Sequence, residues 1–140
     1  VRCERERVVL HKMLFGKKKR HLARLLVVED EPRLAEMVVG FLASHDYDAH
    51  AVGCGADAIA WVQAHEPDVV LLDLSMPEKS GRECLSEMTG LDAEVKVIFF
   101  TGYSAETTVS EGVAGVLQKP FTPADLANEV RSVLDSPEPD

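Results

Sequence analysis

The stretch VVLLD at residues 69–73 places a carboxylate, Asp73, directly after four consecutive apolar residues. A short, uninterrupted apolar run of this kind is typical of a strand that is buried on both faces of a parallel sheet. Open α/β sheets bind their ligands outside the carboxyl ends of such strands. The stretch therefore predicts that Asp73 lies at the ligand-binding edge of a parallel sheet.

Three further apolar runs in the chain end in polar side chains that suit the same edge. Each run is followed by groups that can bind a cation or an anion: Glu29 and Asp30 after residues 24–28, Thr101 after residues 95–100, and Lys119 after residues 115–118. Together with Asp73, these strand ends bring three carboxylates, a hydroxyl and an amine to one edge. Such a set indicates a site for a divalent cation and a phosphoryl group.

The order of these motifs resembles that of a known family, the receiver domains of two-component response regulators. No single motif is specific, but the combination is, because unrelated folds have no reason to end four successive strands in this order. The resemblance extends over most of the chain, from Leu25 to Leu134. It rests on four motifs: Glu29-Asp30, Asp73-Leu74-Ser75-Met76-Pro77 with Gly81 beyond it, Thr101-Gly102, and Lys119-Pro120-Phe121.

Strand and helix patterns alternate along the chain, which predicts an α/β fold with a parallel sheet. The resemblance implies a flavodoxin-like (βα)5 doubly wound sheet with strand order 2-1-3-4-5, the order that chemotaxis receivers show. Only 17 residues separate Thr101 from Lys119, and few of them are apolar at helical spacing, so we expect a short or irregular fourth helix. We expect a basic N-terminal arm at 1–23, the receiver domain at 24–135 and a short tail at 136–140.

The resemblance implies that Asp73 is the phosphoacceptor, a carboxylate that attacks phosphorus and forms an acyl phosphate. It also implies a Mg²⁺ site, in which Asp30, Asp73 and the backbone carbonyl of Ser75 ligate the ion directly. Glu29 stands where aspartate is commoner in the family. We expect it to act through a water molecule, because its extra methylene group lets the carboxylate reach outward.

Two further residues are implied to contact the phosphoryl group: Lys119 as a point charge and Thr101 as a hydroxyl donor. The peptide bond before Pro120 is cis in the family. Receivers usually carry a Tyr or Phe switch residue at the position of Val116, and valine is too short and too stiff for that movement. Tyr103 is the available substitute, although it could equally be a surface aromatic on a loop.

Composition limits the classes of function. Residues 1–24 hold nine Lys and Arg and two Glu, a net charge of +7, so the total of −9 leaves −16 on residues 25–140. An acidic body argues against direct nucleic acid binding, because phosphate neutralisation dominates that affinity. The sequence has no apolar run long enough for a membrane span. Three widely separated cysteines are typical of reduced thiols, so we expect a cytoplasmic protein.

These features predict a signalling switch rather than an enzyme. We expect Asp73 to accept phosphate from a histidine kinase or a phosphotransfer protein, and the chain to catalyse only its own phosphorylation and dephosphorylation. Because the sequence ends soon after the last predicted helix, we expect output through contacts with a downstream protein; the oligomeric state stays open. One alternative is a Mg²⁺-dependent phosphohydrolase, which would favour an acid where Ser75 stands. The other is a receiver-like module that binds partners without phosphorylation.

Overall fold

The computed structural model of the protein describes residues 22–74, 81–92, 94–102 and 113–136. Its centre is a five-stranded parallel sheet in the order β2-β1-β3-β4-β5, which confirms the predicted doubly wound architecture. The strands are β1 (Arg24–Val28), β2 (Asp48–Val52), β3 (Val69–Asp73), β4 (Lys96–Thr101) and β5 (Gly115–Gln118).

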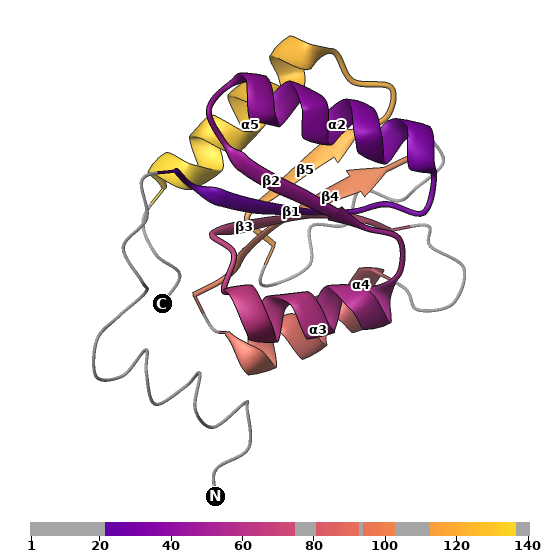
Figure 1. The fold of residues 1–140 in the computed structure, drawn as a ribbon, viewed down its shortest axis with the longest axis vertical. Helices are drawn as coiled ribbons and strands as arrows, with labels where there is room; N and C mark the ends of the chain where they lie inside the picture. The colour runs from indigo at the N-terminus through magenta and orange to yellow at the C-terminus, as the bar shows by residue number, and fades with distance from the viewer. Residues whose placement is uncertain (1–21, 75–80, 93, 103–112, 137–140) are drawn as a thin grey trace, which may run out of the picture.

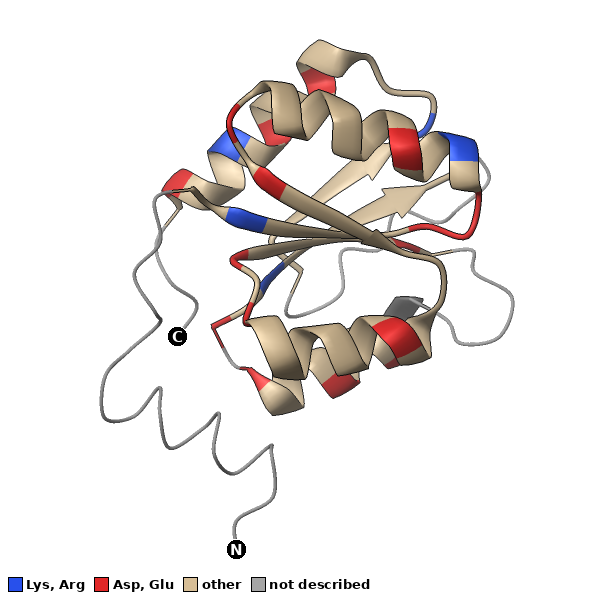
Figure 2. Cartoon of the chain, in the orientation of Figure 1, with Lys and Arg blue, Asp and Glu red and all other residues tan. Residues whose placement is uncertain are grey.

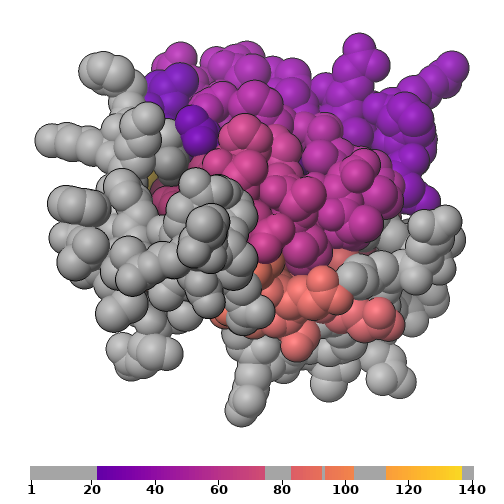
Figure 3. Space-filling view, turned by 60° about the horizontal axis from the view of Figure 1, so that its bottom comes forward, coloured from indigo at the N-terminus to yellow at the C-terminus, as the bar shows by residue number. Residues whose placement is uncertain are grey.

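Helices cover both faces of the sheet (Figure 1). One face carries α2 (Pro32–Ser44) and α5 (Pro123–Asp135), and the other carries α3 (Gly55–His65) and α4 (Gly81–Leu91). Figure 3 shows α3 and α4 side by side on the surface, in agreement with their direct contact. Among the described residues, no helix qualifies as a candidate membrane span.

The helix starts follow the sequence signals. Pro32 lies in the first turn of α2, where its missing N–H costs nothing. At α5, Thr122 is the N-cap: its hydroxyl accepts a hydrogen bond from the N–H of Asp125, and the Asp125 carboxylate accepts one from the N–H of Thr122. This reciprocal pair fixes the point at which the chain turns from the end of β5 into the last helix.

The end of α5 is held by a lysine of the neighbouring sheet. Lys96, the first residue of β4, is only 8% exposed, and its ammonium donates hydrogen bonds to the carbonyls of Val133 and Ser136 at 3.2 and 2.8 Å. A positive charge is favourable at the C-terminal end of a helix, where carbonyl groups lack partners within the helix. Lys96 therefore ties α5 to the amino end of the strand whose carboxyl end carries Thr101.

Alternation along the strands divides the apolar core in two. Leu25 and Val27 pack with α2 and α5, whereas Leu26 and Val28 pack with α3 and α4. The inner strands β3 and β4 are buried along their whole length, and the edge strands β2 and β5 are more exposed. Uninterrupted apolar runs such as VVLLD are therefore buried on both faces, as the sequence predicts.

The segment between β4 and β5 runs from Gly102 to Ala114. The prediction of a short or irregular helix there concerns mainly residues 103–112, which lie outside the described residues, as do Ser75 and Tyr103. Among the described residues of this segment, Gly102, Val113 and Ala114, no helix is assigned. The helix prediction therefore stays a prediction.

Candidate functional site

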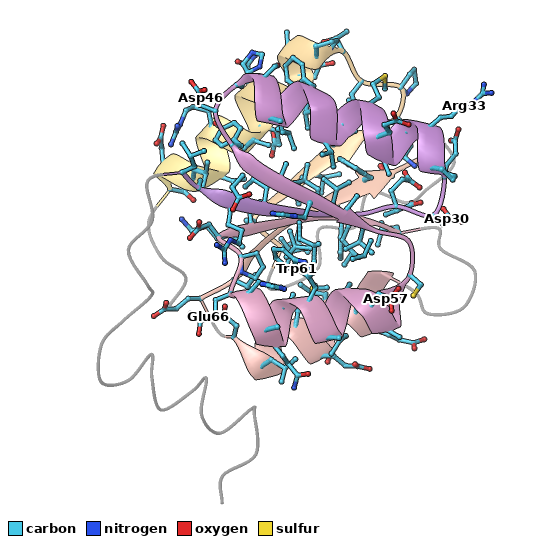
Figure 4. The ribbon with its side chains drawn as sticks, in the orientation of Figure 1. Asp30, Arg33, Asp46, Asp57, Trp61 and Glu66 are labelled. Atoms are coloured by element: carbon cyan, nitrogen blue, oxygen red, sulfur yellow. The ribbon has the colours of Figure 1, made fainter. Side chains whose placement is uncertain are left out.

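The carboxyl ends of the parallel strands meet at one edge of the sheet. Figure 4 shows Asp30 and Asp57 at this edge and Asp46 and Glu66 at the opposite one. Figure 2 shows the acidic turn that follows β1 as a continuous red segment that leads into α2. The residues that the sequence analysis assigned to a site therefore have a common location in the fold.

Backbone hydrogen bonds extend the sheet by one residue beyond its strands. The N–H of Glu29 donates to the carbonyl of Val52 at 3.1 Å, and the N–H of Lys119 donates to the carbonyl of Thr101 at 2.7 Å. If the alternation of β1, β3 and β5 is continued, Glu29, Asp73 and Lys119 lie on the face of α2 and α5. The strands thus place two carboxylates and one ammonium on the same side of the sheet.

Three carboxylates form the acidic part of the site. One oxygen each of Glu29, Asp30 and Asp73 lies within 4.8 Å of the others. Glu29 and Asp73 are each only 3% exposed, whereas Asp30 is open to solvent. Two buried carboxylates at this separation repel each other and lose hydration, so a nearby positive charge or protonation of one of them stabilises the arrangement.

Lys119 supplies that charge. Its Nζ lies 2.8 Å from Oε1 of Glu29 and 3.6 Å from Oδ2 of Asp73. The Glu29 carboxylate also accepts a hydrogen bond from the N–H of Glu31 at 3.3 Å. The peptide bond between Lys119 and Pro120 is cis. The ammonium thus contacts the predicted phosphoacceptor and its acidic neighbour together.

The protonation equilibria reflect this arrangement. Burial and the neighbouring Asp73 raise the pKa of Glu29 from 4.5 to about 7, although the hydrogen bond from Lys119 acts in the opposite direction. Burial disfavours the charge on Lys119, but its hydrogen bond to Glu29 and the charges of both carboxylates outweigh that effect and raise its pKa. Lys119 is therefore fully charged at neutral pH, and Glu29 is poised between its two forms.

Thr101 is the second candidate phosphoryl contact, and its hydroxyl is conspicuous. The residue is 2% exposed, and its Oγ1 is buried without a hydrogen-bond partner among the described residues. A buried hydroxyl without a partner costs about 1–3 kcal/mol, so natural structures keep few of them. The described residues therefore leave the hydrogen-bonding capacity of the Thr101 hydroxyl unused.

Two site features were not anticipated from the sequence. Glu29 is the nearest carboxylate partner of Lys119, and its predicted contact with a metal through water stays a prediction. An aromatic pair, Phe100 and Phe121, also lies next to Lys119. Of the two predicted switch positions, Val116 is half-buried in β5 and pairs with Phe99 of β4, and Tyr103 lies outside the described residues.

The family model described as "Response regulator receiver domain" matches residues 25–131. Its boundaries take in the five strands, apart from Arg24 at the start of β1, and most of α5. Every predicted site residue, from Glu29 to Pro120, falls inside the matched region.

Individual relatives agree with this match. Protein Rrf1 of Nitratidesulfovibrio vulgaris is 35% identical over 106 residues, which cover 74% of this chain and 77% of that protein. The DNA-binding response regulator MtrA of Mycolicibacterium smegmatis is 33% identical over 115 residues, 79% of this chain and 50% of that protein. The chain thus spans about half the length of MtrA. A response regulator receiver domain protein from Clostridium thermocellum superposes with a TM-score of 0.75 at 25% identity, covering 81% and 95% of the two chains.

The raised pKa of Glu29 predicts a pH-dependent stability in the absence of divalent cations. The folded protein keeps the proton on Glu29 up to about pH 7, whereas the unfolded chain releases it near 4.5. This residue's contribution to the free energy of unfolding therefore falls as the pH rises through that window, by at most about 3 kcal/mol. Urea unfolding in EDTA at several pH values measures it.

The comparison that isolates this effect is with Glu29→Gln, which cannot lose a proton. The stability of the native protein relative to Glu29→Gln should decline between about pH 4.5 and 7 and level off above. Glu36→Gln, at an exposed position of α2, is the matched control, and its difference from the native protein should stay constant. An equally constant difference for Glu29→Gln would show that burial does not perturb this carboxyl group.

The unpartnered hydroxyl of Thr101 predicts that its removal does not destabilise the fold. Thr101→Val replaces the hydroxyl with a methyl group, and the free energy of unfolding should stay level or rise by up to about 1 kcal/mol. The control is Thr89→Val on α4, because the Thr89 hydroxyl donates to the carbonyls of Leu85 and Ser86. That variant should lose about 0.5–1 kcal/mol. If Thr101→Val lowered the free energy of unfolding more than Thr89→Val does, the Thr101 hydroxyl would have to stabilise the fold through a partner of its own.

Proposed function

Since the chain belongs to the family of response regulator receiver domains, we propose that it is a phosphorylation switch in which Asp73 accepts the phosphoryl group. The main support for the proposal is the environment of the Asp73 side chain. It is buried, lies 3.6 Å from the Lys119 ammonium, and shares its edge of the sheet with the unpartnered hydroxyl of Thr101. A positive charge and a hydroxyl donor are the groups that a transferred phosphoryl group requires.

The donor we propose is the phosphohistidine of a histidine kinase or a phosphotransfer protein. A carboxylate oxygen of Asp73 attacks phosphorus, the P–N bond breaks, and the imidazole leaves with the electron pair and takes up a proton. Lys119 and Thr101 each bind an oxygen of the transferred group and thereby offset its charge. Water later attacks the phosphorus, the P–O bond to Asp73 breaks, and inorganic phosphate leaves.

The donor set at this edge fits Mg²⁺. Oxygens in a six-coordinate Mg²⁺ shell lie roughly 3–4 Å apart, which agrees with carboxylate oxygens that lie within 4.8 Å of one another. Asp30 and Asp73 would bind the ion directly, Glu29 through water, and the carbonyl of Ser75, outside the described residues, would complete the protein ligands. A bound Mg²⁺ supplies charge neutralisation for the phosphoryl group.

The proposal extends to partners and location. The domain catalyses its own phosphorylation and dephosphorylation and passes the signal to a downstream protein by contact, in the cytoplasm. Its acidic body does not contact nucleic acid directly. This chain matches only 50% of MtrA, so the DNA binding named for MtrA refers to that whole protein.

The direct test is mass spectrometry after incubation with acetyl phosphate and Mg²⁺. The native protein should gain one phosphoryl group, located on Asp73, whereas EDTA or Asp73→Asn should abolish the adduct. Asp57→Asn is the matched control, because this exposed carboxylate lies at the same edge of the sheet in the first turn of α3. It should be labelled like the native protein.

Two outcomes would refute the proposed function. One is a stable phosphoryl adduct on Asp73→Asn, and the other is equal labelling of the native protein in EDTA. Continuous release of phosphate from a range of phosphomonoesters would instead identify a phosphohydrolase.

A further inference from the structure

An aromatic pair lies against the lysine of the site. The rings of Phe100 and Phe121 are stacked, with centroids 5.2 Å apart and planes inclined by 29°. The ammonium nitrogen of Lys119 is 5.9 Å from the centroid of the Phe100 ring. Neither Phe100 nor Phe121 is among the residues that the phosphoryl chemistry itself requires.

The sheet register fixes the position of Phe100. Phe100 is the β4 partner of Asp73 in β3 and of Leu117 in β5, so its side chain is on the same face as Asp73. The residue is fully buried, and Phe121 packs against the same core cluster. The carbonyl of Phe100 also accepts a hydrogen bond from the N–H of Leu74 at 3.1 Å. The ring therefore has little freedom to move.

Lys119, in contrast, would be mobile without support. A lysine side chain has a flexible four-carbon stem and carries about 2 kcal/mol of rotamer entropy, and this one is 26% exposed. Glu29 and Asp73 attract its ammonium from the acidic side, and Glu29 is the nearer of the two. A cation within about 6 Å of an aromatic ring is attracted to the ring face. The Phe100 ring thus provides an additional attraction from a rigid part of the sheet.

We propose that Phe100 is a positioning residue for phosphoryl transfer: its ring, fixed by the stack with Phe121, holds the ammonium of Lys119 within reach of Asp73. The inference rests on the proposed function, because the rate that it concerns is the rate of Asp73 phosphorylation. Phe100 does not touch the reacting atoms. It acts through the lysine.

The test replaces Phe100 with a series of fluorinated phenylalanines. Successive fluorines weaken the negative face of the ring while nearly preserving its shape, so a purely packing role predicts little change. The rate of phosphorylation by acetyl phosphate should fall stepwise, by about two- to fivefold for the trifluorinated ring. The pKa of Lys119, followed by NMR of its ε-carbon, should fall in the same order.

The same series at Phe99 is the matched control. Phe99 is the preceding residue of β4, is 1% exposed, and packs on the opposite face of the sheet with α3 and α4. Its fluorination should change neither the rate nor the titration of Lys119. Phe100→Leu, which keeps an apolar side chain but no ring, should resemble the trifluorinated variant.

The outcomes separate the two proposals. A native protein that gains no phosphoryl group would refute the proposed function and this inference together. A native protein that is phosphorylated normally, with rates and Lys119 pKa values that do not change along the Phe100 series, would refute only the role of Phe100. An equal decline of the phosphorylation rate along the Phe99 and Phe100 series would also refute it, because the effect would then come from packing of the strand.

Discussion

The ion cluster of Lys119, Glu29 and Asp73 is the interaction on which the site depends. Both carboxylates are almost completely buried, and each would carry a large desolvation cost if the ammonium were absent. The cluster also couples the ends of three strands, because each of its members follows or ends a different one. Removing Lys119 would therefore take the nearby positive charge from both acids, whereas removing one acid leaves the ammonium the other acid as a partner.

The sheet makes this cluster possible by holding its members in a fixed register. The inner strands are buried on both faces, and hydrogen bonds continue past the strand ends at Glu29 and Lys119. The same strand, β4, carries Thr101 at one end and is tied at the other to the end of α5 through Lys96. The site thus rests on the fully buried inner strands of the sheet, and a phosphoryl group would act on a strand that contacts the end of the last helix.

Much of this was readable from the sequence, because apolar runs that end in polar residues determine both the strands and the edge where they meet. The strand order, which the family resemblance implied, was confirmed. Asp73 and Thr101 end the strands that their runs predict, and Lys119 directly follows its strand. Glu29 and Lys119 are 90 residues apart in the sequence, and their contact depends on the conformations of two long side chains. The periodicity of apolar residues does not encode those conformations. The stack of Phe100 on Phe121 depends likewise on the strand register and on the turn after Pro120.

In the proposed mechanism, this edge of the sheet gathers Asp73, Lys119 and Thr101 around a single phosphoryl group. A crystal structure of the protein with Mg²⁺ and beryllofluoride, which mimics the acyl phosphate, tests it most directly. We expect beryllium bound to an oxygen of Asp73, with Nζ of Lys119 and Oγ1 of Thr101 each within hydrogen-bonding distance of a fluorine. A fluoride group bound to another carboxylate, or one on Asp73 that neither Lys119 nor Thr101 approaches, would contradict it.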